Sequence, residues 1–168
     1  REDLVMTTAN PRPVTIPAKG YSALRRGRIS ETGRIYLITT TTRQRRRLFT
    51  REDTARSVAT CFEDSRLLAS NRMLAWVLMP DHSHWLLELG PDQNLSQSVS
   101  RLKSASSRHV KAVMGGKGIP VWERGFHDRA LRSEENLEAA ADYLIANPLR
   151  AGLVERIEDY PYWNSVWK

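Results

Sequence analysis

The segment from Met73 to Leu89 constrains the fold of this 168-residue chain more than any other. Met73 to Met79 is a continuous apolar run, and His82 to Leu89 alternates between polar and apolar side chains. Pro80-Asp81, which separates the two runs, is typical of a turn. The pattern therefore predicts an antiparallel β-hairpin.

The second strand of this hairpin carries two of the four histidines, His82 and His84. Side chains two positions apart project from the same face of a strand, with Cα atoms about 6.6 Å apart, so two imidazoles can converge on one ion. The alternate residues face the other side and can pack under helices while the histidine face stays open; they are Ser83, Trp85, Leu87 and Leu89. An ordinary polar strand face would show the same spacing, so a metal site requires a third ligand.

The remaining patterns predict a strand over residues 33–42, a helix from a cap at Thr50 and Asp53 to about Ser70, and a helix from Leu95 to Val113. The glycines at 115, 116 and 118 end that helix. A short strand is expected within residues 121–131, followed by a helix from Ser133 to about Asn147-Pro148. This order favours an α+β fold, a split βαβ (ferredoxin-like) sandwich with an antiparallel sheet flanked by helices.

The last predicted helix offers a third ligand. Its buried stripe comprises Leu137, Ala141, Leu144 and Ile145, which places Tyr143 and Asn147, four residues apart, together on its flank. A tyrosine in such a position is ordinarily a packing residue, and it becomes a candidate nucleophile only beside other catalytic groups.

The net charge of +7 and the pI near 10.0 indicate a polyanionic partner such as nucleic acid. Residues 1–50 hold 11 Arg and Lys against 3 acids, so the first third of the chain contributes the whole positive excess. Residues 1–20 contain three prolines and no period, and we expect an extended arm there, followed by one domain over residues 21–168. A solvated tail explains the composition equally well.

We expect a cytoplasmic protein, associated with the nucleoid when bound to DNA. The sequence has a single cysteine, Cys61, which excludes an internal disulfide, and no apolar run approaches the roughly 20 residues that span a bilayer. Residues 1–10 lack the apolar core of a secretory signal.

Several motifs together resemble those of HUH single-strand transposases, the IS200-like superfamily, and within it the tyrosine transposases associated with repetitive extragenic palindromes (REPs). His82-Ser83-His84 is similar to the two-histidine motif, and the segment from Tyr143 to Val154 is similar to the tyrosine helix. Supporting segments lie at residues 24–28, 122–129 and 160–163, so the resemblance covers roughly residues 21–167. Ser83 departs from the family pattern, which has a hydrophobic residue between the histidines.

The resemblance implies a metal-dependent endonuclease that cleaves palindromic hairpins of single-stranded DNA and rejoins the strands. Tyr143 would form a 5′-phosphotyrosine, while His82 and His84, with Asn147 as the third ligand, would hold Mg²⁺ or Mn²⁺. The residues expected to contact DNA are Arg25, Arg26, Arg28, Arg43, Arg45, Arg46, Arg101, Lys103, Arg108, Arg124, His127 and Arg129.

Two other function classes fit parts of the sequence. A module derived from a transposase could bind hairpins without chemistry, although the complete set of two histidines, tyrosine and asparagine favours an enzyme. A metal-dependent hydrolase of a small substrate would use the histidines but would leave the basic arm without a purpose. We expect a monomer; an exchange of the tyrosine helix, as in related insertion-sequence enzymes, would instead give a dimer.

Overall fold

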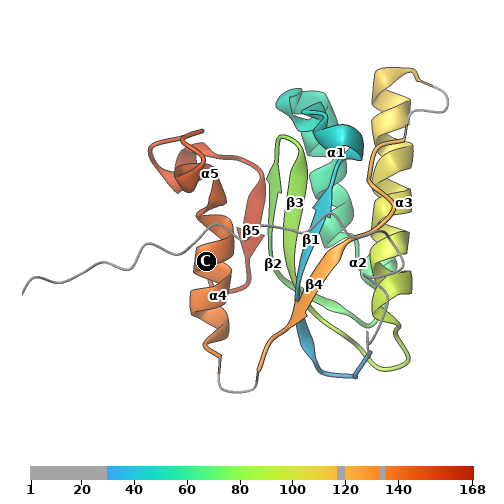
Figure 1. Ribbon diagram of the computed structural model, residues 1–168, viewed down its shortest axis with the longest axis vertical. Coiled ribbons are helices and arrows are strands. Elements are labelled where there is room, and N and C mark those ends of the chain that lie inside the picture. Colours follow the sequence, from blue (N-terminus) through green and yellow to red (C-terminus); the bar gives the residue numbers. More distant parts are fainter. Residues whose placement is uncertain (1–29, 117–119, 133–134) are drawn as a thin grey trace, which may run out of the picture.

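The computed structural model describes residues 30–116, 120–132 and 135–168, so the expected arm and Arg25, Arg26 and Arg28 lie outside the described residues. A five-stranded sheet forms the middle of three layers (Figure 1). Its strands are all antiparallel and follow the order β4-β1-β3-β2-β5. They are β1 (Ile35–Thr41), β2 (Arg72–Met79), β3 (His82–Glu88), β4 (His127–Ala130) and β5 (Trp163–Ser165). The predicted α+β sandwich is confirmed.

The hairpin of β2 and β3 is also confirmed, with Met79 opposite His82 across the Pro80-Asp81 turn. Residues 74–79 of β2 are all buried, because helices cover both faces of the sheet at this strand. That double coverage explains the unbroken apolar run in the sequence.

One face of the sheet packs against α1 (Glu52–Glu63), α2 (Ser65–Leu68) and α3 (Leu95–Met114) over the larger hydrophobic core. The single helix expected up to Ser70 is wrong. It is divided at Asp64, whose side chain accepts a hydrogen bond from the backbone N–H of Arg66 and caps a new helix. The expected cap at Thr50 is also wrong, because its hydroxyl donates to the carbonyl of Arg47 and the chain enters α1 at Arg51 without a side-chain cap.

Helix α3 agrees with its prediction. Gly115 adopts φ = +64°, the left-handed conformation that ends many helices and suits glycine. One residue of the expected buried face, Val113, is instead 38% exposed, because it lies in the last turn beyond the core.

The opposite face of the sheet is covered by α4 (Leu137–Ile145), followed by the short α5 (Asn147–Arg150). Helix α4 begins later than expected, since Asn136 caps it by accepting a hydrogen bond from the N–H of Ala139, and Ser133 lies outside the described residues. The helix also ends at Ile145 instead of continuing to Asn147. Pro148 has no N–H to donate to the carbonyl of Leu144, and the side-chain amide of Asn147 donates to this carbonyl instead, at 2.7 Å.

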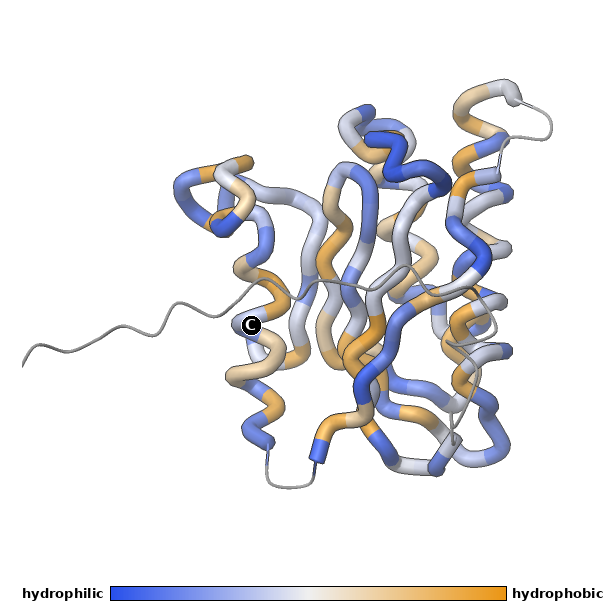
Figure 2. The backbone as a smooth tube through the Cα atoms, viewed as in Figure 1, coloured by the Kyte–Doolittle hydropathy of each residue, from blue (hydrophilic) through white to orange (hydrophobic). Residues whose placement is uncertain are grey.

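Figure 2 shows apolar residues concentrated along the central strands and on the helix sides that face them, with hydrophilic residues in many of the outer turns. Helix α4 packs mainly on β2 and β5, so the other half of this sheet face is only partly covered. Within the described ranges, no helix is both long and apolar enough to cross a membrane.

Candidate metal and nucleophile site

His82 and His84 lie on the α4 face of β3, with ring centroids 4.9 Å apart and ring planes at 83°. The alternate residues of β3 point to the larger core, as expected, and Ser83 is fully buried there. Its hydroxyl forms a hydrogen bond of 2.8 Å with the hydroxyl of Thr40, which accounts for a polar residue at this position. The serine therefore changes packing on the far side of the sheet from the histidines.

Each histidine is held by a hydrogen bond at its Nδ1 atom. His82 Nδ1 lies 2.6 Å from Oδ1 of Asp81, and His84 Nδ1 lies 2.8 Å from the hydroxyl oxygen of Thr39 on β1. With the proton on Nδ1, each ring donates to its oxygen partner and keeps the Nε2 lone pair for a ligand. Such a carboxylate or hydroxyl partner fixes both the tautomer and the orientation of a metal-binding imidazole.

The histidine face is less open than expected, since both rings are half-buried. Burial is the main cause that lowers the pKa of His84 to about 3, and the neighbouring His82 ring and the charges of Arg150 and Arg45 act in the same direction. Burial also lowers the pKa of His82, although the neighbouring Asp81 carboxylate opposes that shift. Both imidazoles are therefore neutral near pH 7, which is the form that binds a metal ion.

Asp81 also forms an ion pair with Arg45, whose Nε atom lies 3.4 Å from Oδ2 of the carboxylate. Arg45 and Gln44 both have φ = +56°, a strained conformation for residues other than glycine, in the turn after β1. The carboxylate of Glu123 accepts hydrogen bonds from the Gln44 N–H and from Arg43, and holds this turn against the sheet. A cation is thereby placed beside the histidine pair.

Tyr143 is 61% exposed on α4, which is unusual for a large aromatic side chain and leaves its hydroxyl accessible. The guanidinium carbon of Arg150 lies 4.0 Å from the centre of its ring. The charge of Arg150 also lowers the pKa of His84, so the same arginine contacts the tyrosine ring and contributes to the electrostatic environment of the histidine pair. No hydrogen bond within the described ranges joins Tyr143 directly to either histidine.

Asn147 uses its amide nitrogen to satisfy the carbonyl of Leu144, so its Oδ1 atom is the end that remains for a ligand. An amide oxygen beside two neutral imidazoles suits Mg²⁺ or Mn²⁺. No group of three or more His, Cys, Asp or Glu residues that could hold a metal ion occurs in the described part of the chain. A third ligand at this site would therefore come from an amide, from water or from the substrate.

His127 lies in the same cross-strand row as the histidine pair. Thr39 is opposite His127 on β4 and opposite His84 on β3, so the three side chains share one face of the sheet. His127 is half-buried there, at the edge strand. This row of side chains therefore extends from the edge strand β4 across β1 to His84 on β3.

The other candidate DNA contacts are dispersed. Arg129 forms an ion pair with Glu135, and Arg101 donates to the Leu67 carbonyl and to Gln93. Lys103 is half-buried and donates to the carbonyls of Glu123 and Gly125. Arg46 is half-buried, while Arg108 and Arg124 are exposed, and none of these three forms an ion pair among the described residues. A role in DNA binding stays a prediction for all of them.

Sequence reasoning missed the contributions of four residues to the site, namely Thr39, Arg45, Asp81 and Arg150. The sequence alone suggests a DNA contact for Arg45 and a turn position for Asp81. The position of Asp81 directly before His82 was a usable signal, because a carboxylate next to a histidine often orients it. The other three depend on strand register and helix placement.

Comparisons with known proteins agree with this architecture. A family model for IS200-like transposases matches residues 32–146, more than half of the chain. A REP-associated tyrosine transposase of Escherichia coli K12 is 31% identical over 90 residues, and a protein of Haemophilus influenzae described in the same terms is 29% identical over 98 residues. The first alignment covers 52% of this chain and 50% of the E. coli protein, and the second covers 53% of this chain and 56% of the H. influenzae protein. The chain therefore spans about half the length of either relative.

Two solved structures share the fold. One is a REP-associated tyrosine transposase bound to a REP hairpin, with a TM-score of 0.61, 23% identity, and coverage of 81% of this chain and 79% of the other. The second is a Deinococcus radiodurans protein described as a transposase, with a TM-score of 0.51, 19% identity, and coverage of 80% and 94%. The sheet, its flanking helices and the family match together place this chain in the family of IS200-like transposases.

Proposed function

We propose that this protein cleaves palindromic hairpins of single-stranded DNA and rejoins the strands, with Tyr143 as the nucleophile. The observation that carries the proposal is the exposed Tyr143 on α4, with the Arg150 guanidinium 4.0 Å over its ring, on the face of the sheet that also carries His82 and His84. A cation beside an exposed phenol, on the same side of the sheet as two neutral imidazoles, suits a phosphate group. The REP-associated relatives and the hairpin-bound structure with the same fold support DNA hairpins as the substrate.

His82 and His84, with the amide oxygen of Asn147, would hold a divalent ion, Mg²⁺ or Mn²⁺. When bound, this ion would polarise a non-bridging oxygen of the scissile phosphate. Asp81 and Thr39 would keep the two rings oriented, and Arg45 and Arg150 would add positive charge around the phosphate.

The phenol oxygen of Tyr143 would lose its proton and attack phosphorus as the bond from phosphorus to the 3′ oxygen breaks. The products are a 5′-phosphotyrosine on the protein and a strand that ends in a protonated 3′-hydroxyl. Because the ester conserves the bond, a 3′-hydroxyl can later attack it and release Tyr143. Cleavage and rejoining are then one reaction in two directions.

Incubation with labelled single-stranded hairpins from around its own gene, in Mn²⁺, followed by a denaturing gel, tests the proposal. We expect a covalent adduct with the wild-type protein. Tyr143→Phe should give no adduct but bind the hairpin as well as wild type, because only one hydroxyl is removed. His82→Ala, His84→Ala or added EDTA should abolish the adduct with a small loss of affinity.

Cleavage by Tyr143→Phe at the wild-type rate would reject this residue as the nucleophile, and full activity in EDTA would remove the metal from the mechanism. Tight hairpin binding by the wild-type protein without any adduct would instead support a binding module that lacks catalysis. Tyr36→Phe is unsuitable as a control because that ring is buried in the larger core. Tyr162→Phe is the control. Tyr162 directly precedes β5 and packs, partly buried, against the larger core, on the other side of the sheet from α4. This variant should form the adduct as the wild type does.

A further inference from the structure

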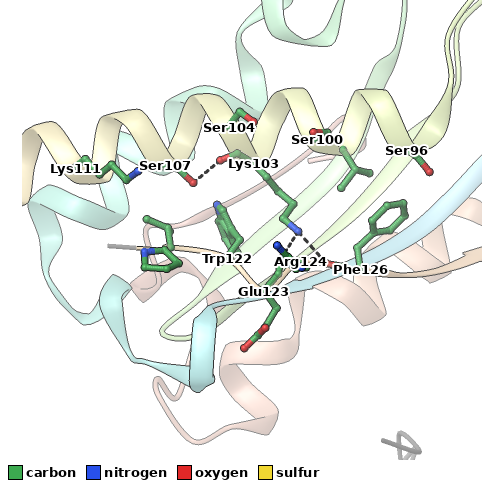
Figure 3. Close-up of a pocket in the computed structure, with 14 residues that line it drawn as sticks. Ser96, Ser100, Lys103, Ser104, Ser107, Lys111, Trp122, Glu123, Arg124 and Phe126 are labelled. Atoms are coloured by element: carbon green, nitrogen blue, oxygen red, sulfur yellow. Dashed lines mark hydrogen bonds between the residues drawn. The ribbon is translucent and has the colours of Figure 1, made fainter. Parts of the chain in front are cut away.

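A groove of about 300 Å³ runs between α3 and residues 120–126, on the other side of the sheet from Tyr143 (Figure 3). Its α3 wall carries four serines, and the opposite wall is formed by the segment that leads into β4. Val99, Trp122 and Phe126 contribute its apolar surface. The serines are Ser96, Ser100, Ser104 and Ser107.

The two walls are tied together, so the shape of the groove is set by the fold. The Lys103 ammonium donates to the carbonyls of Glu123 and Gly125, at 2.6 and 2.8 Å. The Trp122 indole N–H donates to the hydroxyl of Ser106. A ligand would therefore meet a preformed surface and would not have to order it.

The groove is electropositive. Lys103, Lys111 and Arg124 line it, and its one acid, Glu123, is neutralised on its other side by Arg43 and the Gln44 N–H. Figure 3 shows the Glu123 carboxylate directed away from α3. Cations next to hydroxyl donors are typical of sites for phosphate groups.

The spacing and size of the groove favour one extended strand. Ser100 and Ser104 are exposed and stand one helical turn apart, about 6 Å along the axis, close to the step of one nucleotide. The volume of about 300 Å³ lies at the lower end of small-ligand pockets, roughly 300–1,000 Å³, so the groove can take in the backbone of one strand but cannot enclose a duplex.

One end of the groove lies next to the sheet edge that leads to the candidate site. Phe126 directly precedes His127, and the row of His127, Thr39 and His84 crosses the sheet from this edge. A DNA strand that leaves the groove and passes around the β4 edge would come onto the sheet face that carries the histidine pair.

We propose that this groove binds the sugar–phosphate backbone of single-stranded DNA that continues from the hairpin. The proposal rests on the function proposed above, and it adds a second contact that does not depend on base sequence. The Ser100 and Ser104 hydroxyls donate to phosphate oxygens, while Lys111 and Arg124 supply the charge.

The test compares affinities for a hairpin with a single-stranded flank, the same hairpin with blunt ends, and an unstructured poly-dT strand. Ser100→Asp combined with Ser104→Asp places two negative charges on the groove wall. Gln97→Glu combined with Ala112→Asp adds the same charge to exposed α3 positions outside the groove and serves as the control. Thermal unfolding of each variant confirms that it is folded.

We expect the groove variant to lose about tenfold or more in affinity for the flanked hairpin and for poly-dT, with little change for the blunt hairpin. The control should bind all three as the wild type does. Equal losses for flanked and blunt hairpins, equal losses in the control, or unchanged binding by the groove variant would each overturn the proposal. The adduct assay separates the two ideas, because a wild-type protein that forms the adduct, together with a groove variant that binds all three DNAs as the wild type does, would overturn this proposal and leave the proposed function standing.

Discussion

At the scale of single residues, Asp81 is the partner through which His82 can be tested. Oδ1 of its carboxylate accepts a hydrogen bond from the Nδ1–H group of His82, and Oδ2 forms an ion pair with Arg45. Asp81→Asn keeps the size and removes the charge, so we expect the affinity for Mn²⁺ to fall by about 10- to 100-fold, as for other partners of metal-binding histidines. Calorimetric titration of the protein with Mn²⁺ measures this directly.

Glu88→Gln is the matched control, because Glu88 lies at the other end of β3 from His82 and, among the described residues, forms an ion pair with the exposed Arg72 and with no histidine. An Asp81→Asn protein that binds Mn²⁺ as tightly as wild type would show that this carboxylate has no part in holding the site.

Some of these residues could be predicted from the sequence and others could not. His82, His84 and Tyr143 stand in local motifs, so a reading along the chain finds them. Thr39 reaches His84 only through the register of β1 against β3, and Arg150 reaches Tyr143 only because the chain turns again after α4. Neither relation has a local signal.

At the scale of elements, the hairpin could be predicted because one run is continuously apolar, the next alternates between polar and apolar residues, and Pro80-Asp81 separates them. The interruptions at Asp64 and Ile145 could not, since each depends on one side chain that takes over a backbone partner. Asn147 illustrates the consequence: it was expected on a continuous helix, and it instead closes the gap that Pro148 creates.

Lys103 is the cross-link between α3 and the segment before β4, and it carries a prediction at this scale. Lys103→Met keeps the length of the side chain but leaves the Glu123 and Gly125 carbonyls without their donor, so we expect a loss of about 1–3 kcal/mol in the free energy of unfolding. Urea unfolding measures it. Lys111→Met, on the same groove wall, should change stability by less than about 0.5 kcal/mol; equal effects would mean that Lys103 does not connect the two walls.

At the scale of the whole molecule, the charge belongs mainly to residues 1–50. Replacing Arg25, Arg26 and Arg28 together by Ala should weaken DNA binding and flatten its salt dependence, by about 0.7 units of slope per lost contact on single strands and about 0.9 on duplex. Affinities at several salt concentrations, for a hairpin and a scrambled strand, measure both effects.

A loss confined to the hairpin would show that these arginines distinguish its shape, and an equal loss on both strands would show general attraction to phosphate. If neither affinity nor slope changes, this segment has no part in binding DNA, and the interpretation of the charge asymmetry is wrong.

The two cores on opposite faces of the sheet differ in size: of the residues that the structure describes, 21 are buried on the α1 and α3 side and 9 on the α4 side. The smaller layer, which carries Tyr143, should open locally at a lower free energy than the rest of the protein. In hydrogen–deuterium exchange, we expect the backbone amides of α4 to exchange well before those of the middle of α3. Equal protection of both helices would contradict this, whereas early exchange would mean that gentle warming loosens the layer that carries Tyr143, and with it the proposed cleavage, while most of the molecule stays folded.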